Sequence, residues 1–206
     1  MAKRKTTDRA WQRMLSGRRL DLLDPSPMDI EIEDIAHGLA RVARWNGQTS
    51  GDWAFSVAQH SVLVERLFNR FYPDMSRQWR LACLLHDAAE FVIGDMITPF
   101  KTILADEYKA VESRLTVAVH IRFGLPGMLP DHVNKAIKRA DKVAAFLEAT
   151  QLAGFSEAEA RKAIARPRDV PPIKIKPQQP QDAAEAYLRR FKYLGGKVNG
   201  NTFRST

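Results

Sequence analysis

Cysteine, strand-like alternation and long apolar runs are scarce in this 206-residue chain. The one cysteine, Cys83, has no partner for an intramolecular disulfide and lies in an apolar run, so we expect a buried thiol in a reducing compartment. No run of 18 apolar residues occurs, and no apolar segment follows the basic residues at the start. We therefore expect neither a membrane span nor a secretory signal, and a cytoplasmic location without a membrane partner.

The formal net charge of +8 comes from the two ends of the chain. Residues 1–19 carry seven basic residues and one acidic residue, and residues 161–206 carry eleven basic and three acidic residues. Residues 20–160 hold 14 basic and 20 acidic residues, so the middle of the chain is acidic. Because the ends have few aromatic residues for stacking and no recognisable reader motif, solvated tails are favoured over nucleic-acid-binding segments. A nucleic-acid-binding protein that uses these ends is the alternative.

Apolar residues recur at helical spacing through most of the chain, whereas alternation with period two is almost absent. We therefore predict an all-α fold, a single helical bundle of about six to eight helices with basic extensions at both ends. The predicted units are a basic N-terminal extension (1–19), one catalytic domain (20–165), and a proline-rich connector with a last helix and tail (166–206). With 45% apolar residues, the chain can bury a core.

Caps, glycines and prolines set the expected helix boundaries. Ser56 is predicted to cap a helix that ends at Tyr72-Pro73-Asp74, and Ser156 begins a capping-box pattern with Glu159. The connector over 166–180 contains five prolines and is expected to be extended. The other predicted helices cover residues 30–44, 76–92 with Gly94 as the stop, 98–123, 131–152 with Asp131 as the cap, and 181–193.

Four residues with metal-ligating side chains lie on predicted helices in apolar surroundings: His60, His86, Asp87 and Asp141. Burying an ionised carboxylate without a partner costs several kcal/mol, so these groups need a counterpart. Imidazole and carboxylate together suit a divalent ion such as Mn, Fe, Co, Ni, Zn or Mg. Two histidines and two aspartates would leave coordination positions open to water, as a catalytic site requires. Since neighbouring helix residues differ by about 100° in direction, His86 and Asp87 reach one ion only if it lies between their directions.

The sequences around these residues resemble those of a known family. The segments are VAQHS (57–61), LLHDAAE (84–90), GDMITPFK (94–101) and RADK (139–142). In order and spacing they resemble the nucleotidase branch of the HD-domain metal-dependent phosphohydrolase superfamily. The closest known types are the bacterial 5′-deoxynucleotidase and a phage-type dATP triphosphohydrolase. The resemblance covers about residues 28–152 and implies a metal-dependent hydrolase of small nucleotides, which works as a homodimer.

The resemblance also implies roles for single residues. The quartet would be the ligand set for the metal. Glu90, one turn after His86 on the same helix face, and Asp95 would be catalytic carboxylates. Arg44 and Trp45 would hold the phosphate and the sugar or base. Because a divalent ion lowers the pKa of bound water toward about 7, attack by this water would release phosphate or polyphosphate.

Several alternatives stay open at this point. Glu90 could instead orient His86, Asp95 could be a turn residue, and Trp45 could pack in the core. Charge alone adds two candidate phosphate contacts, Lys101 and Arg19. If the Arg18-Arg19 pair folds over the site and binds distal phosphates, it would favour a triphosphate substrate. Within the superfamily, a hydrolase of a signalling nucleotide, such as a guanosine tetraphosphate or a cyclic dinucleotide, is the competing function.

Two other histidines match nothing in the pattern. His37 and His120 are expected to be structural, and His132, in the first turn of a predicted helix, is expected to face solvent.

Overall fold

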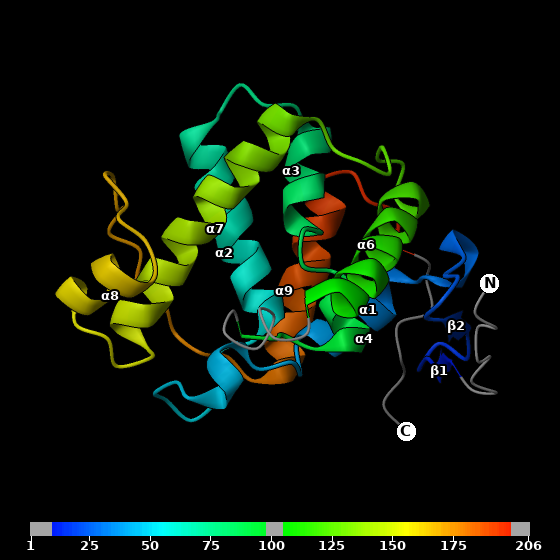
Figure 1. Cartoon of the computed structure of the whole chain (residues 1–206), viewed down its shortest axis with the longest axis horizontal. Coiled ribbons are helices and arrows are strands. Elements are labelled where there is room, and N and C mark those ends of the chain that lie inside the picture. Colours follow the sequence, from blue (N-terminus) through cyan, green and yellow to red (C-terminus); the bar gives the residue numbers. More distant parts are fainter. Residues whose placement is uncertain (1–9, 98–104, 199–206) are drawn as a thin grey trace.

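The computed structural model describes residues 10–97 and 105–198. Helices make up most of this part of the chain, which confirms the predicted all-α class (Figure 1). Two 3₁₀ turns, Pro27–Asp29 and Arg44–Gly47, accompany the helices. The helices are α1 (Ile32–Leu39), α2 (Val57–Phe71), α3 (Arg77–Leu84), α4 (Glu90–Ile93), α6 (Ala105–Arg122), α7 (Asp131–Gln151), α8 (Glu157–Ala163) and α9 (Pro180–Tyr193).

Helix α2 forms the centre of the bundle. Its start is fixed as predicted, because the Ser56 hydroxyl accepts a hydrogen bond from the Gln59 backbone N–H at 3.3 Å. The helix packs against α3, α7 and α9, and α7 runs beside it in Figure 1. Leu67 and Phe68 on α2 are completely buried. A residue that projects from this helix into the bundle is therefore held by packing on several sides.

Helix α9 joins the bundle from far along the chain and ties α2 to α3. The hydroxyl of Tyr187, which is fully buried, donates a hydrogen bond to the Leu84 carbonyl at 3.2 Å. Glu65 on α2, also fully buried, accepts hydrogen bonds from Arg80 of α3 at 2.9 Å and from Arg190 of α9. The last helix is thus part of the same packed body as the first three.

The predicted helix over 30–44 is wrong at its C-terminal end. Helix α1 ends at Leu39, and the chain becomes extended before Arg44, whose backbone N–H donates to the Phe55 carbonyl at 2.8 Å. Trp45 and Asn46 follow with φ of 57° and 50°, a left-handed conformation that a regular helix excludes. Backbone pairing with the segment just before α2 has replaced the last helical turn, and it brings Arg44 next to the start of α2.

The predicted helix over 76–92 is also wrong, because it is interrupted. Helix α3 ends at Leu84, residues 85–89 form successive turns, and the short α4 begins at Glu90. Gly94, with φ of 77°, ends α4 as predicted. The interruption lies at His86 and Asp87, so these two neighbours are not held to the 100° separation of a regular helix.

An antiparallel hairpin precedes the helices and contradicts the expectation of a solvated tail for the described part of the extension. Strand β1 (Trp11–Arg13) pairs with β2 (Arg19–Asp21), and Leu20 is completely buried. Arg18 in the turn donates to Glu31 at 2.8 Å. Three-residue strands are too short to show a period of two, which explains why the sequence did not reveal them. The hairpin crosses residue 19, where the N-terminal extension was predicted to end.

Most other expectations for the described residues hold. The capping box at Ser156 is present, and residues 166–179 contain no helix or strand. The predicted cap at Asp131 is wrong by one residue, since Pro130 occupies the N-cap position of α7. Cys83 is a buried free thiol, and burial raises its pKa. The predicted helix start at Thr98 lies outside the described residues. Among the helices of the described chain, none has the length and apolar character that a membrane crossing demands.

Candidate metal centre and active site

His60 projects from the second turn of α2 into the bundle and is completely buried. Its Nδ1 lies 2.5 Å from Oε1 of Glu148, which is also completely buried and comes from α7. Because a carboxylate can only accept, Nδ1 carries the proton and donates it to Glu148. The other ring nitrogen, Nε2, therefore presents its lone pair to the opposite side, as a metal ligand must.

His86 is oriented in the same way by the backbone of α3. Its Nδ1 donates to the Cys83 carbonyl at 2.9 Å, so Nε2 is again the nitrogen with the lone pair. This Nε2 lies 3.1 Å from Oδ2 of the neighbouring Asp87. The turn at residues 85–89 allows both side chains to point to one place, which the predicted continuous helix would have made difficult.

The four predicted ligands meet at one point between α2, the 85–89 turn and α7. His60 Nε2 lies 3.2 Å from Asp141 Oδ1 and 3.4 Å from Asp87 Oδ2. Neither this Nε2 nor that of His86 has a hydrogen-bond partner within the described chain, although both are buried. The ligand atoms of His60, His86 and Asp141 all lie within 4.8 Å of one another. Buried lone pairs that face carboxylates without hydrogen bonding to them fit a divalent cation between them.

The electrostatics of this centre favour a cation. Burial opposes the charged form of Asp87, but the adjacent His86 and His60 outweigh it and lower the pKa of Asp87 well below its usual range. The pKa of Asp141 is lowered against burial in the same way, mainly through His60. The side chains of Asp87 and Asp141 are 24% and 38% exposed, so one side of the centre is accessible to solvent. The centre thus combines ionised carboxylates with an open approach for a substrate.

Glu148 is a site residue that the sequence analysis missed. Besides His60, it accepts hydrogen bonds at Oε2 from Trp45 Nε1 at 2.9 Å and from Arg44 Nε at 3.3 Å. Burial alone would raise the pKa of Glu148, but its interactions with His60, Arg44 and Trp45 lower it to about 2. One signal was available: Glu148 follows Asp141 by two helical turns on the same face, within an otherwise apolar stretch. A buried acid in that position orients the ligands of a metal rather than facing solvent.

Arg44 links Glu148 to the predicted catalytic carboxylate Asp95. Its Nη1 lies 2.9 Å from Asp95 Oδ2, and the Arg44 side chain is only 14% exposed. Burial disfavours the charged guanidinium, but Glu148 and Asp95 outweigh this effect and raise the pKa of Arg44. Glu90 is buried at the start of α4, and its charge acts on both Arg44 and Tyr108 of α6. The structure therefore brings Arg44, Glu90 and Asp95 into the neighbourhood of the metal centre.

The remaining predicted substrate contacts lie in different places. Trp45 is held by its bond to Glu148, and its ring lies 5.8 Å from that of Phe155. Arg19 stacks on Trp11 in the hairpin, 4.5 Å above the ring centroid. Lys101 lies outside the described residues. The roles of these three residues remain predictions.

Comparison with known proteins establishes the family. Residues 57–145, which contain all four predicted ligands, match the HD domain family. The uncharacterized protein RCAP_rcc00048 of Rhodobacter capsulatus is 58% identical over 194 residues, which cover 93% of this chain and 99% of the relative. The helical bundle and its His-Asp centre thus define an HD-domain protein. The chain belongs to the HD-domain phosphohydrolase superfamily, which confirms the resemblance at this level.

Two further proteins are similar over parts of their length. The uncharacterized protein YfdR of Escherichia coli K12 is 33% identical over 108 residues, which span 52% of this chain and 55% of that protein. A solved structure, the cyanophage S-2L HD phosphohydrolase DatZ bound to dA and one catalytic Zn²⁺ ion, superposes with a TM-score of 0.49 at 20% identity. That superposition covers 77% of this chain and 95% of the phage protein.

Family and site together define the enzyme class. HD phosphohydrolases depend on metal, and the donor set at His60, His86 and Asp141 suits a divalent ion. The protein is therefore an HD-family phosphohydrolase with a divalent metal ion as cofactor.

Proposed function

We propose that the enzyme removes phosphate or polyphosphate from small 5′-nucleotides, with a preference for deoxynucleotides. The observation that carries the proposal is the convergence of four nitrogen and oxygen donors from three segments, with both histidines fixed through Nδ1. The motifs of these segments resemble the nucleotidase branch, and the Arg44-Trp45 pair before the first ligand favours this branch over hydrolases of signalling nucleotides.

In this proposal His60 and His86 would hold the metal through Nε2, and Asp87 and Asp141 would hold it through their carboxylates. When bound, a divalent ion supplies Lewis acidity, which offsets phosphoryl charge and lowers the pKa of water toward about 7. Glu148 keeps His60 in the tautomer that can ligate, through the bond at Nδ1. The chain thus contributes a fixed donor set, and the open side near Asp141 admits the phosphate.

Glu90 and Asp95 are proposed to handle the protons. Glu90 is buried one turn after His86, where its carboxylate would orient the attacking water and accept its proton. Asp95 forms an ion pair with Arg44, and an incoming phosphate would compete with Asp95 for that guanidinium. Once displaced from Arg44, Asp95 would be free to pass a proton taken up from solvent to the departing sugar oxygen.

The test is a substrate panel with the purified protein. Ribo- and deoxynucleoside mono-, di- and triphosphates are incubated with Mn, Co, Mg, Ni or Zn, and phosphate and polyphosphate release are measured separately. We expect metal-dependent release from at least one 5′-nucleotide, faster for the deoxy form. Asp141→Asn should abolish both metal retention and release, whereas Asp182→Asn, at the exposed start of α9, should change neither. Absence of hydrolysis for every nucleotide with every metal would overturn the proposal.

A further inference from the structure

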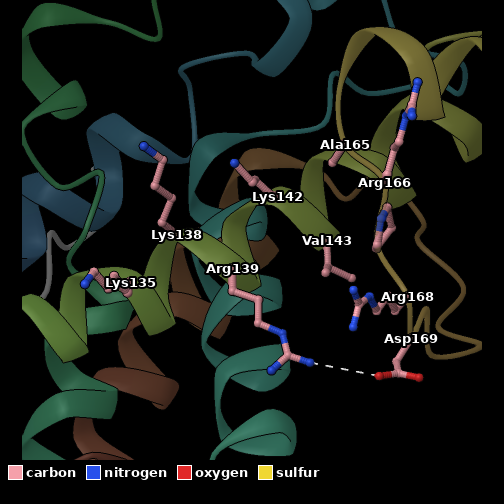
Figure 2. Close-up of a pocket in the computed structure, with 10 residues that line it drawn as sticks. Lys135, Lys138, Arg139, Lys142, Val143, Ala165, Arg166, Arg168 and Asp169 are labelled. Carbon is pink, nitrogen blue, oxygen red and sulfur yellow. Dashed lines mark ion pairs between the residues drawn. The ribbon is translucent and has the colours of Figure 1, made fainter.

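A basic groove of about 700 Å³ lies between α7 and the segment that follows α8 (Figure 2). Its walls are formed by α7 on one side and by residues 165–169 on the other. In Figure 2, Arg168 and Asp169 face α7 from the opposite wall, and Asp169 is the one acidic residue that lines the groove. The six basic residues that line it are Lys135, Lys138, Arg139, Lys142, Arg166 and Arg168.

Around α7, Arg139 and Val143 of the groove lie opposite the metal centre, whereas Lys138 and Lys142 lie about 60° and 100° from Asp141. Asp141 and Glu148, two turns apart, mark the flank that faces the metal centre. Arg139 and Val143, which line the groove, are two residues before and after Asp141, so each points about 160° away from it. None of the four predicted metal ligands lines the groove. A molecule bound against Arg139, Val143 and residues 165–169 therefore lies across α7 from the predicted ligands.

Little within the described chain compensates the positive charge of the groove. Its basic positions on α7 are spaced by three or four residues, and like charges at this spacing destabilise a helix. Arg139 lies 4.0 Å from Asp169, and Arg166 donates to a backbone carbonyl, that of Arg161, at 3.2 Å. Four basic side chains of the groove have no hydrogen-bond or ion-pair partner within residues 10–97 and 105–198: those of Lys135, Lys138, Lys142 and Arg168. An anion in the groove would relieve this repulsion.

We propose that the groove is a second anion site, which binds an oligophosphate chain of about three phosphates. Lysines act as point charges for phosphate, and arginines add a planar fork, so both walls suit phosphoryl oxygens. The four positions on α7 span seven residues, about 10 Å along the axis, which is the scale of a short oligophosphate. The volume falls in the range of small-molecule sites, about 300–1,000 Å³.

The residues that line the groove also argue against recognition of nucleotide bases. No aromatic residue lines the groove, and its apolar members are Val143, Ala165 and Pro167. A single-stranded nucleic acid gains much of its affinity by stacking on aromatic rings, which this surface does not offer. The groove therefore recognises the phosphates themselves, whether they belong to free oligophosphate or to the tail of a nucleoside triphosphate.

Inorganic tripolyphosphate is the probe for this site, titrated calorimetrically into the full-length protein at low and at high salt. We expect saturable binding that weakens as salt increases. A triple variant that neutralises three basic residues of the groove should bind at least tenfold more weakly: Lys135→Gln, Lys138→Gln and Arg168→Gln. The matched control removes three exposed charges outside the groove and should bind as the parent does: Lys109→Gln, Lys162→Gln and Arg189→Gln.

The other arms of the experiment separate the remaining possibilities. In the metal-free Asp141→Asn variant, a nucleoside triphosphate should bind within about threefold of tripolyphosphate if the phosphates alone are recognised, and a much tighter nucleotide would overturn that part. An oligonucleotide that binds the groove more tightly than tripolyphosphate, or equal losses in both triple variants, would overturn the proposal. Asp141→Asn should keep full tripolyphosphate binding, and the groove variant should keep hydrolysis of a nucleoside monophosphate. The groove and the proposed function can therefore fail independently.

Discussion

Glu148 does more to define the metal centre than any other residue outside the ligand set. It is completely buried, yet it is ionised, because three donors converge on its two oxygens. His60 is one of them, and Arg44 and Trp45 are the others. The same carboxylate thus fixes a metal ligand and two proposed substrate contacts. A change at Glu148 should affect the metal and the substrate together.

Glu148→Gln tests this link with little change in size. The amide keeps an oxygen that can accept from His60, but the negative charge that orients the imidazole is lost. We expect the affinity for the divalent ion to fall about 10–100-fold, as for other residues that orient metal ligands. Competition with a chromophoric chelator measures the affinity. Glu157→Gln on the exposed surface of α8 is the control, and equal affinity for the two variants would contradict the role of Glu148.

His120 makes the stability of the fold depend on pH. Burial lowers its pKa below 6.5, against the opposing effect of hydrogen bonds to the Gly127 and Pro126 carbonyls. The unfolded chain therefore binds the proton more readily than the folded chain. The contribution of neutral His120 to stability is complete above pH 6.5 and is lost as the pH falls from there toward the lowered pKa.

The corresponding experiment measures urea unfolding of the metal-free protein at pH 7 and pH 5. The parent should lose up to about 1.4 kcal/mol per pH unit through this one group. His120→Asn should be less stable at pH 7 but should lose less on acidification, whereas His132→Asn, at an exposed position of α7, should behave as the parent. Parallel pH profiles for the parent and His120→Asn would show that His120 is not the sensor.

At the scale of single residues, the sequence indicated the candidate ligands but not the residue that contacts them from α7. His60, His86, Asp87 and Asp141 could be predicted because their types and local motifs point to a metal. Glu148 was missed, because its spacing from Asp141 does not reveal the contact with α2, which lies 88 residues away in the sequence. Charge patterns along one helix do not record such contacts.

Two elements, α1 and the short α4, set the position of Glu90, a proposed catalytic carboxylate. Gly38 on α1 has no side chain at the point where α4 crosses it, and a Cβ there would lie 2.9 Å from the Phe91 carbonyl oxygen. Since Phe91 follows Glu90 directly, this close approach sets the position of Glu90. The crossing leaves no room for even one extra methyl group.

Gly38→Ala is therefore expected to destabilise the protein, although alanine has the higher helix propensity. In an open helix the change would stabilise by up to about 1 kcal/mol. Here the clash with backbone should cost about 1–3 kcal/mol and should also lower kcat by moving Glu90. Thermal unfolding and steady-state kinetics measure the two effects. An unchanged or higher melting temperature would show that the two helices can separate without cost.

The sequence predicted elements well where caps are explicit and poorly where tertiary contacts override periodicity. Ser56 and the capping box at Ser156 mark their helices correctly. The interruption between α3 and α4 was hidden, because residues 81–92 are apolar on both sides of it, apart from His86, Asp87 and Glu90. The early end of α1 was hidden as well, because it depends on backbone pairing with Phe55. Both deviations bring side chains to the metal centre.

For the whole molecule, the metal should act as a stabilising ligand. The donors come from α2, the 85–89 turn and α7, so an ion that binds only the folded chain links distant segments. At a free concentration 100 times its Kd, such a ligand adds about 2.7 kcal/mol of stability. For a chain of this size, this corresponds to an increase in Tm of about 5–10 °C.

Differential scanning calorimetry with a chelator and with added Mn, Co or Zn measures this effect. We expect the chelated protein to melt earlier and the added ion to restore the higher Tm. Asp141→Asn should show no such shift, because one donor is missing. If the Tm of the parent does not respond to chelator and metal, the four residues do not form the ion site.

The overall architecture could be predicted from periodicity, but its basic surface could not. The sequence places positive charge at the ends of the chain, and a solvated tail was the natural interpretation. In the structure, Arg166 and Arg168 instead face lysines of α7 across a groove. The path of the connector over residues 166–180 decides which charges lie on the same surface. Counts of charge along the chain contain no information on that path.

The buried Glu65, which is paired with Arg80 and Arg190, also affects the stage of synthesis at which the chain can bind a metal ion. All four predicted ligands have been synthesised once Asp141 has emerged, but the carboxylate that joins α2 to α3 still lacks Arg190. A nascent chain that stops before α9 would carry all four predicted ligands, but its buried Glu65 would be paired with Arg80 alone. Metal loading should therefore follow completion of the last helix, and the ribosome-bound chain should not compete for the ion.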